Sequence, residues 1–485
     1  LQPERRGDEA YSVRLEAALR EKRGSATVCQ FNNGDTDLAA KFHKSLPHDD
    51  LGQVDSEDFA ALKDCTFSGD YDICEAVPAG ESTGRLVTPI AGFTIDMSGS
   101  AISATTVPPM PTLDSAELAA QLAECYWMAL ARDVPFSEYG ENSITTAAAE
   151  NLAGMEGFSE MFAVAIESDG SVNASSQLFR ANFYGVETGP VISQLLVNNF
   201  TIDSLTVTPK QTTFVPGVDY MTDYDDWLNI QNGGIPDSDE EVDSQPRFIR
   251  NARDLARLVV TDRVFTESFR GALILMEQDA FSKSGYNGPY TNSSRQRGSI
   301  NNGPAHILRN LGAAELAERS SWYQKWQVHL VARPEALAGT VHNTLNGYLD
   351  APIHTSLLEN TELLERIAKA NAAQNTNGSE TYLLSQARWG RARHHVSLLL
   401  VRLDTRKAVK EGSPVHPSYP AGHAVQNGAF ATVLKAHVGL DRGSDCYSNP
   451  VFPDDDGLEL LEYNGGCLTF EGEINKLAAN VAFGR

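Results

Sequence analysis

Apolar residues recur at a helical period over much of the chain after residue 115. The first such run, Leu118, Leu122, Cys125, Met128 and Leu130, falls near a spacing of 3.6 residues. The preceding Asp114-Ser-Ala-Glu117 resembles a capped helix start. Similar patterns predict further helices over residues 145–167, 248–278, 304–332, 359–373, 379–405, 422–438 and 471–485.

Alternating apolar and polar positions are rare, and residues 200–207 and 396–401 are the two strand candidates. The first 110 residues are rich in turn formers after a helix-like run at 9–23. We therefore predict a mainly α fold of packed helical bundles. A loop-rich region is expected over residues 1–114 and a helical-bundle catalytic domain over residues 115–485.

Composition indicates an ordinary globular protein with a large core, because 41% of the 485 residues are hydrophobic and 21% are charged. The 39 basic and 64 acidic residues give a formal charge of −25, which repels nucleic acid and anionic lipid. No apolar run approaches the roughly 20 residues needed to cross a bilayer. We expect neither nucleic acid nor a membrane as a partner.

Four of the six cysteines flank loops. Cys65 and Cys74 enclose a short turn-rich stretch, and Cys446 and Cys467 enclose an irregular one, so two disulfide staples are expected. Cys125 lies in a helical pattern and is expected to be a buried thiol. Cys29 is either free or bridges subunits.

Export is favoured over a cytosolic location by the cysteines together with four N-x-Ser/Thr sequons. The chain begins with Leu1, as a processed or trimmed protein would. We expect a secreted or cell-wall protein. The sequons are at Asn173, Asn199, Asn292 and Asn377.

The segment from His416 to His423, His-Pro-Ser-Tyr-Pro-Ala-Gly-His, leads directly into a helical pattern. Its two prolines keep the approach extended, which leaves the amides of Ala421 and Gly422 free at the first helical turn. Such a helix end attracts an anion, and Gly422 lets an oxyanion come close to the main chain. His423 would project toward the same point as an acid/base group.

A second cluster of positive charge lies in residues 322–334. Lys325 and Arg333 are eight residues apart, so both are predicted to reach one side of a helix that ends before Pro334. The planar fork of Arg and the point charge of Lys suit the oxygens of phosphate or vanadate.

Taken in order, Lys-x7-Arg-Pro and Pro-x-Gly-His resemble the oxyanion signature of vanadium haloperoxidases and the related acid phosphatases. The form His-Pro-Ser-Tyr-Pro-x-Gly-His is similar to that of the algal bromoperoxidases, and the resemblance covers most of residues 250–485. It implies a vanadate cofactor that acts as a Lewis acid. The implied reaction oxidises bromide or iodide with hydrogen peroxide to hypohalous acid, which halogenates small organic acceptors.

The resemblance also implies a role for each matching residue. His423 would be the acid/base group, Lys325 would in addition polarise bound peroxide, and His416 and Trp322 would lie on the halide side. Asp262 would orient Arg485. The implied donors to vanadate are Lys325, Arg333, Ala421, Gly422, His423 and Arg485.

Two departures from the family pattern stand out. Ala421 replaces the usual Ser and loses one hydrogen bond to vanadate, worth about 1–2 kcal/mol, so weaker cofactor retention is expected. The covalent vanadate ligand of the family is a His a few residues beyond the final Arg, and the chain ends at Arg485 without it. The resemblance and Cys29 together suggest a homodimer or a higher even-numbered oligomer.

Two other functions compete with this interpretation. A phosphatase uses the same donors, because vanadate mimics the transition state of phosphoryl transfer. His416 and Tyr419 favour the haloperoxidase. A non-catalytic anion-binding relative is the third possibility, which Ala421 and the missing His allow.

Overall fold

The computed structural model describes residues 38–81, 84–93, 107–158, 176–181, 183–202, 204–234, 242–261, 266–281, 290, 293–301, 303–387 and 413–484. The chain divides into two compact units. Unit 1 comprises Leu1–Tyr126, Asp219–Asp239 and Glu318–Gly422, and unit 2 comprises Trp127–Val218, Glu240–Ala317 and His423–Arg485. The expected division at residue 114 stays a prediction, since both units combine segments that are far apart in sequence.

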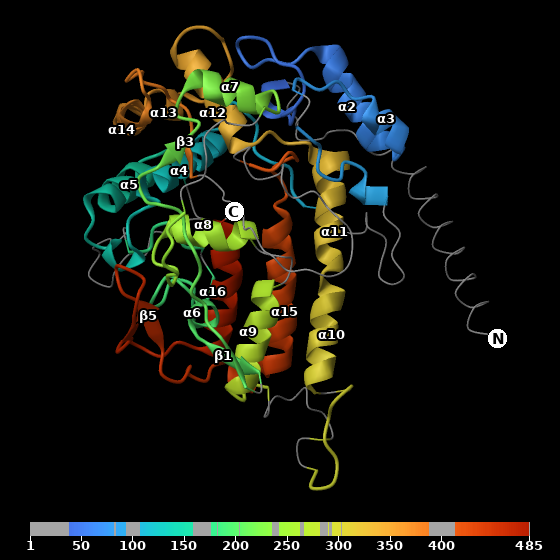
Figure 1. The fold of residues 1–485 in the computed structure, drawn as a ribbon, viewed down its shortest axis with the longest axis vertical. Helices are drawn as coiled ribbons and strands as arrows, with labels where there is room; N and C mark the ends of the chain where they lie inside the picture. The colour runs from blue at the N-terminus through green and yellow to red at the C-terminus, as the bar shows by residue number, and fades with distance from the viewer. Residues whose placement is uncertain are drawn as a thin grey trace, which may run out of the picture. The chain divides into compact units, whose positions relative to one another are not determined.

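Helices dominate both units, which confirms the mainly α fold class (Figure 1). Strands in the described part of the chain form three antiparallel pairs of two strands each. No helix among the described residues is long and apolar enough to cross a membrane.

Unit 1 is built from short helices around a core that includes Phe42, Leu62, Trp326 and Leu330. Its elements are η1 (Leu38–Ala40), α2 (Ser56–Ser68), α3 (Tyr71–Glu75), η2 (Ala91–Phe93), β3 (Asp219–Tyr220), α7 (Tyr224–Gln231), the π-helical turn η7 (Gln324–His329), α12 (Pro334–Leu345), α13 (Thr355–Leu358), α14 (Thr361–Gln374) and β4 (Gln386–Ala387). Strands β3 and β4 form an antiparallel pair in which Asp219 lies opposite Ala387.

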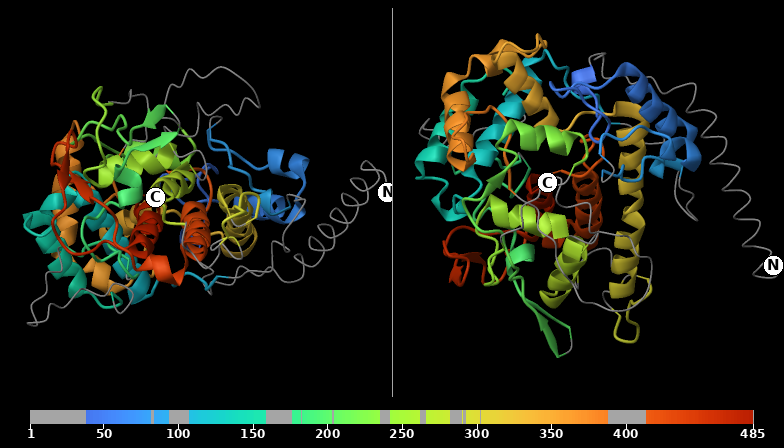
Figure 2. Two further views of the ribbon diagram at one scale, coloured as in Figure 1. Left: turned by 90° about the horizontal axis from the view of Figure 1, so that it is seen from below. Right: turned by 45° about the horizontal axis from the view of Figure 1, so that its top comes forward.

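Unit 2 is a helical bundle whose core draws apolar side chains from six of its described helices, among them Leu275, Leu311, Leu434 and Leu477. Helices α9, α15 and α16 lie side by side in both figures of the fold (Figures 1 and 2). The elements are η4 (Phe136–Glu138), α5 (Ser143–Ala153), α6 (Gln194–Val197), β1 (Phe200–Ile202), β2 (Leu205–Val207), α8 (Ala252–Thr261), α9 (Thr266–Glu277), α10 (Pro304–Ala314), β5 (Val451–Pro453), β6 (Leu460–Glu462) and α16 (Phe470–Phe483).

Three helices contain a boundary between the units: α4 (Ala116–Ala131), α11 (Leu316–Tyr323) and α15 (Gly422–Gly443). The predicted cap of α4 is confirmed, because the Ser115 hydroxyl accepts a hydrogen bond from the Leu118 amide at 3.2 Å. The helices expected near residues 359, 422 and 471 are also confirmed. The strand expected at 200–207 is a hairpin, with Phe200 opposite Val207.

Other predicted elements differ from the structure or extend over residues that it does not describe. Helix α5 ends at Ala153, and residues 159–175 lie outside the described part. The helix expected over 248–278 is seen as α8 and α9, with residues 262–265 undescribed. Residues 379–387 are not helical and end in β4, while the strand candidate at 396–401 and the run at 9–23 lie outside the described residues.

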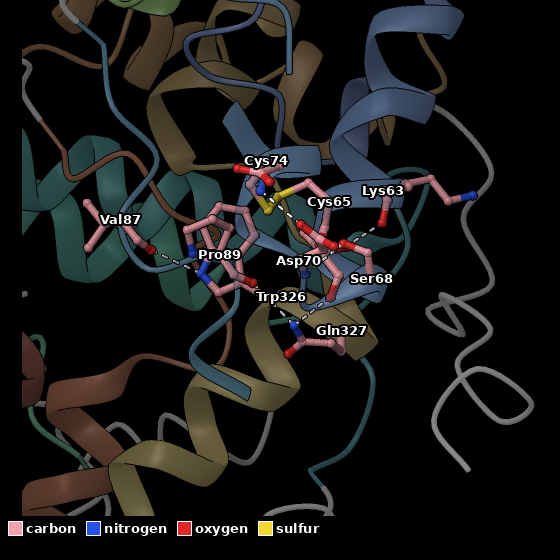
Figure 3. The surroundings of a disulfide bond; sticks show 11 residues. Lys63, Cys65, Ser68, Asp70, Cys74, Val87, Pro89, Trp326 and Gln327 are labelled. Atoms are coloured by element: carbon pink, nitrogen blue, oxygen red, sulfur yellow. Dashed lines mark hydrogen bonds between the residues drawn. A yellow bond between two sulfur atoms is a disulfide. The ribbon is translucent and has the colours of Figure 1, made fainter. Parts of the chain in front are cut away.

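The N-terminal region is more helical than its turn formers predict. Asp55 caps α2, and the helix ends at Gly69, whose positive φ of 62° suits a residue without Cβ. Asp70 then caps α3. The Cys65–Cys74 disulfide joins the two helices, as expected, and Figure 3 shows its surroundings. The turn-rich stretch is thus the short connection between two capped helices.

The N-terminal region also keeps η7 in place through hydrogen bonds. Helical turn η7 contains Lys325. The Gln327 side-chain amide donates to the carbonyls of Thr66 at 2.8 Å and Pro89 at 3.2 Å, and the Trp326 indole donates to the Val87 carbonyl at 3.2 Å (Figure 3). These bonds tie η7 to segments some 240–260 residues earlier in the chain. The loop-rich region therefore serves to position this turn.

In unit 2 the Cys446–Cys467 disulfide is also formed, which confirms the second staple. Cys125 is a free thiol on α4, half-buried where a buried one was expected. Cys29 lies outside the described residues.

Candidate oxyanion site

Lys325 and Arg333 do not share a helix, which corrects the sequence-based prediction. The helix expected over 304–332 is divided into α10, α11 and η7. It ends at Leu330, which takes a left-handed conformation with φ 47°. Arg333 is extended and immediately precedes α12, in which Pro334 is the first residue.

The extended link before Arg333 is held from two sides within unit 1. Val331 pairs with Lys41 in an antiparallel bridge, and the Ala332 amide donates to the Ala40 carbonyl at 3.0 Å. On the other side, the Ser418 hydroxyl donates to the Ala332 carbonyl at 2.6 Å. Segments from the N-terminal region and from the His416–His423 motif thus fix where α12 begins.

Arg333 is a buried cation with spare hydrogen-bonding capacity. Its side chain is 10% exposed, and its guanidinium makes no hydrogen bond to any described residue. Among the described residues the nearest acid is Glu335, whose Oε1 lies 4.0 Å from Nε. Burial lowers the pKa of Arg333, and Glu335 opposes that shift. Burying a charged group whose hydrogen-bond donors lack acceptors is costly, so this arrangement suits an anionic ligand such as vanadate or phosphate.

Lys325 lies beside His416 and Trp322, as expected. Its Nζ is 3.5 Å from His416 Nδ1 and 5.3 Å from the centre of the Trp322 ring, and the two rings meet edge-on at 4.9 Å. His416 Nδ1 is 2.8 Å from the Pro417 carbonyl. A carbonyl oxygen only accepts, so in this hydrogen bond Nδ1 is the donor, and the Lys325 ammonium is then a close neighbour of Nδ1 without donating to it.

Gly422 lies close to an acidic side chain of the same unit. A Cβ added at Gly422 would come 3.3 Å from Glu318 Oε1, which also accepts a hydrogen bond from the Trp322 indole at 3.3 Å. Gly422 is the first residue of α15, as predicted, and Ala421 immediately precedes it. A helix of this length presents amide donors at its N-terminus.

For the remaining predicted residues the described part of the chain gives no contact with this cluster. His423 follows Gly422 in the chain, begins the second unit and is half-buried. Asp262 and Arg485 lie outside the described residues. Unit 1 therefore places Trp322, Lys325 and His416 in contact with one another, and it holds Arg333 in an extended link.

Sequence reasoning missed three residues around Arg333: Lys44, Glu335 and Ser413. Glu335 is 1% exposed, and its Oε1 lies 3.4 Å from Lys44 Nζ and accepts a hydrogen bond from the Ser413 hydroxyl. Burial acts to raise the pKa of Glu335, but Lys44, Arg333 and Ser413 outweigh it and lower that pKa. Glu335 could have been found from the sequence, because it follows Arg333-Pro334 directly. Lys44 is 291 residues away from Glu335, so no local sequence pattern connects the two.

A mainly helical chain with a buried guanidinium short of hydrogen-bond acceptors and a lysine–histidine–tryptophan contact has the features expected of a helical oxyanion-binding enzyme. No family model matches the chain. The vanadium-dependent bromoperoxidase of Ascophyllum nodosum is 63% identical over 487 aligned residues, which is 100% of this chain and 84% of that protein. A vanadium-dependent bromoperoxidase of Corallina officinalis is 29% identical over 93% of this chain and 83% of its own length.

A solved structure agrees with these relatives. The homohexameric second vanadate-dependent bromoperoxidase of Ascophyllum nodosum matches with a TM-score of 0.85 and 38% identity, over 100% of this chain and 81% of that one. The chain belongs to the vanadium-dependent bromoperoxidases.

Proposed function

We propose that this protein binds vanadate and oxidises bromide with hydrogen peroxide, and that the resulting hypobromous acid halogenates small organic acceptors. The names of its relatives support the reaction. The observation that carries the proposal is Arg333, a buried guanidinium without a hydrogen bond to any described residue. A tetrahedral oxyanion supplies the acceptors that this group lacks.

Bound vanadate supplies Lewis-acid activation of peroxide. Arg333 would hold the anion and offset its charge, and Lys325 would donate a hydrogen bond to hydrogen peroxide and draw electron density from its oxygens. The amides of Ala421 and Gly422 at the start of α15 donate to the same anion.

The histidines move or hold protons. His423 would accept a proton from hydrogen peroxide as the acid/base group of the site. His416 and Trp322 lie beside Lys325 and form the halide side of the site. Arg485 is assigned as a further donor to the anion, and Asp262 as the carboxylate that orients it.

Bromination of a phenol dye tests this reaction. We expect the full-length protein to brominate phenol red when vanadate, hydrogen peroxide and bromide are all present, and to lose this activity when any one is omitted. Hydrolysis of p-nitrophenyl phosphate without vanadate is the control for the phosphatase alternative. Phosphate hydrolysis without any dye bromination would overturn the proposal.

We also propose that the protein is exported, to the cell wall or the medium, and forms an even-numbered homo-oligomer. Two disulfides and the exposed sequons at Asn199 and Asn377 support export. A homohexameric relative supports assembly. Sedimentation of the native protein and glycan analysis by mass spectrometry test these two points. A monomer would overturn the assembly, and a reduced, unglycosylated native protein would overturn export.

A further inference from the structure

Lys44 is a buried cation that reaches the acid next to Arg333. It is 1% exposed, and its Nζ lies 2.9 Å from the Ser413 carbonyl and 3.3 Å from the Ser413 hydroxyl oxygen. Its Nζ is also 3.4 Å from Glu335 Oε1. The backbone holds Lys44 in this place, because the Phe42 amide donates to the Leu330 carbonyl at 2.9 Å and the Ser45 amide donates to the Gln231 carbonyl at 2.6 Å.

Glu335 has two cations within reach and is bound more closely by one of them. Lys44 approaches it to 3.4 Å, whereas Arg333 remains at 4.0 Å and makes no hydrogen bond to it. Ser413 adds a donor on the Lys44 side, and the Trp227 indole fixes the Glu335 backbone by donating to its carbonyl at 2.9 Å. The carboxylate is thus neutralised without taking up the hydrogen-bonding groups of Arg333.

We propose that Lys44 is a positioning residue that holds Glu335 and so keeps the Arg333 guanidinium available for the oxyanion. The inference rests on the proposed function, since it assumes that Arg333 binds vanadate. A carboxylate that lost Lys44 would draw in the remaining cation, Arg333, and would present its own negative charge to the anion. Both effects weaken oxyanion binding.

The proposal makes opposite predictions for the two members of the ion pair. Lys44→Met leaves Glu335 charged and shifts it toward Arg333, so oxyanion affinity falls. Glu335→Gln removes the competing carboxylate and its repulsion of the anion, so affinity is unchanged or rises. The double variant Lys44→Met/Glu335→Gln replaces one neutral pair by another and regains affinity. A purely structural role for the pair predicts instead that both single variants weaken binding.

Isothermal titration calorimetry of the full-length, vanadate-free protein with orthovanadate tests this, with inorganic phosphate as a second probe. We expect Lys44→Met to raise Kd by about tenfold or more, and the double variant to return within about threefold of the wild-type Kd. Lys44→Arg, which keeps the cation, is the conservative rescue and should bind like the wild type. Thermal unfolding of each variant without vanadate checks folding.

Two results would overturn the inference: a folded Lys44→Met protein that binds orthovanadate like the wild type, or equal weakening by Lys44→Met and Glu335→Gln. Should Lys44→Met fail to fold, Ser413→Ala takes its place, with weaker binding expected and unchanged binding counting against the proposal. A wild-type protein that binds neither anion contradicts the proposed function itself, which separates the two failures.

Discussion

Two buried arginines, one in each unit, differ in how far the fold supplies hydrogen-bond acceptors for their guanidinium groups. Arg253 in unit 2 is 1% exposed, and its Nε and Nη2 bind the two carboxylate oxygens of Asp133 at 2.5 and 2.6 Å. Its Nη1 donates to the Val218 carbonyl at 2.8 Å. Arg333 in unit 1 is also buried, yet it has an acid no closer than 4.0 Å and no hydrogen bond to a described residue.

The difference distinguishes structural from ligand-binding charge. A buried guanidinium with a bidentate carboxylate and a carbonyl has its donors engaged by the fold. A guanidinium that the fold leaves short of acceptors costs free energy until an anion arrives. We therefore expect Arg253 to stabilise the fold and Arg333 to hold the cofactor.

The largest effect is expected from Asp133→Ala. It leaves the buried Arg253 without its carboxylate, so the free energy of unfolding should fall by about 3 kcal/mol. Urea unfolding followed by circular dichroism measures this. Vanadate affinity of the folded protein should not change. A loss of less than roughly 1 kcal/mol would show that the bidentate pair does not stabilise the fold as expected.

Next in size is the response to Arg333→Met. Vanadate affinity should fall by about 100-fold, because several charge-assisted hydrogen bonds to the anion are lost. The free energy of unfolding should change by less than about 1 kcal/mol, since an apolar side chain replaces an unsaturated buried charge. Arg366→Met, which alters an exposed arginine of α14 in the same unit, is the matched control and should affect neither quantity. Strong destabilisation without loss of vanadate binding would reverse the roles of the two arginines.

A smaller gain is expected from Ala421→Ser. A hydroxyl at this position before α15 adds one hydrogen bond to the anion that Arg333 holds, worth about 1–2 kcal/mol, so vanadate affinity should rise by roughly tenfold. Dialysis against a chelator, followed by vanadium analysis, measures cofactor retention. The same substitution in the Arg333→Met background should recover part of the lost affinity. Equal vanadium retention by the wild type and by Ala421→Ser would place the anion away from residue 421.

The smallest effect concerns acid stability. Burial acts to raise the pKa of Asp133, but the hydrogen bond and charge of Arg253 outweigh it, so the folded pKa lies below the ordinary value. The stabilisation from this pair is therefore complete above the ordinary Asp pKa of about 3.9 and is lost as pH falls through the lower folded value. Urea midpoints measured below about pH 4 should decline less steeply in Asp133→Ala than in the wild type. Urea midpoints that decline equally with falling pH in both proteins would contradict a stabilising role for the Asp133–Arg253 pair.

The sequence carries the class of fold and the chemistry of the motif because both depend on local patterns. Apolar periodicity locates α14, α15 and α16, and Pro420-Ala-Gly-His423 locates the start of α15. The same local logic fails at Leu330, because its left-handed turn follows from the pairing of residues 40–42 with residues 330–332. Tertiary contacts there override a helical pattern that the side chains alone support.

The site is predictable in its residue types but not in its arrangement. Lys325, His416 and Trp322 meet as the motif suggests. The support around Arg333 comes instead from Lys44 and Ser413, which lie 291 and 78 residues from Glu335 along the chain. Side chains brought together only by folding leave no spacing pattern in the sequence.

A crystal structure of the full-length protein soaked with orthovanadate would show directly whether Arg333 binds the anion. We expect a tetrahedral anion whose oxygens lie within hydrogen-bond distance of the Arg333 guanidinium and of Lys325 Nζ, with Glu335 still bound to Lys44. An anion bound elsewhere, or an Arg333 guanidinium closed onto Glu335 with no anion beside it, would contradict this expectation.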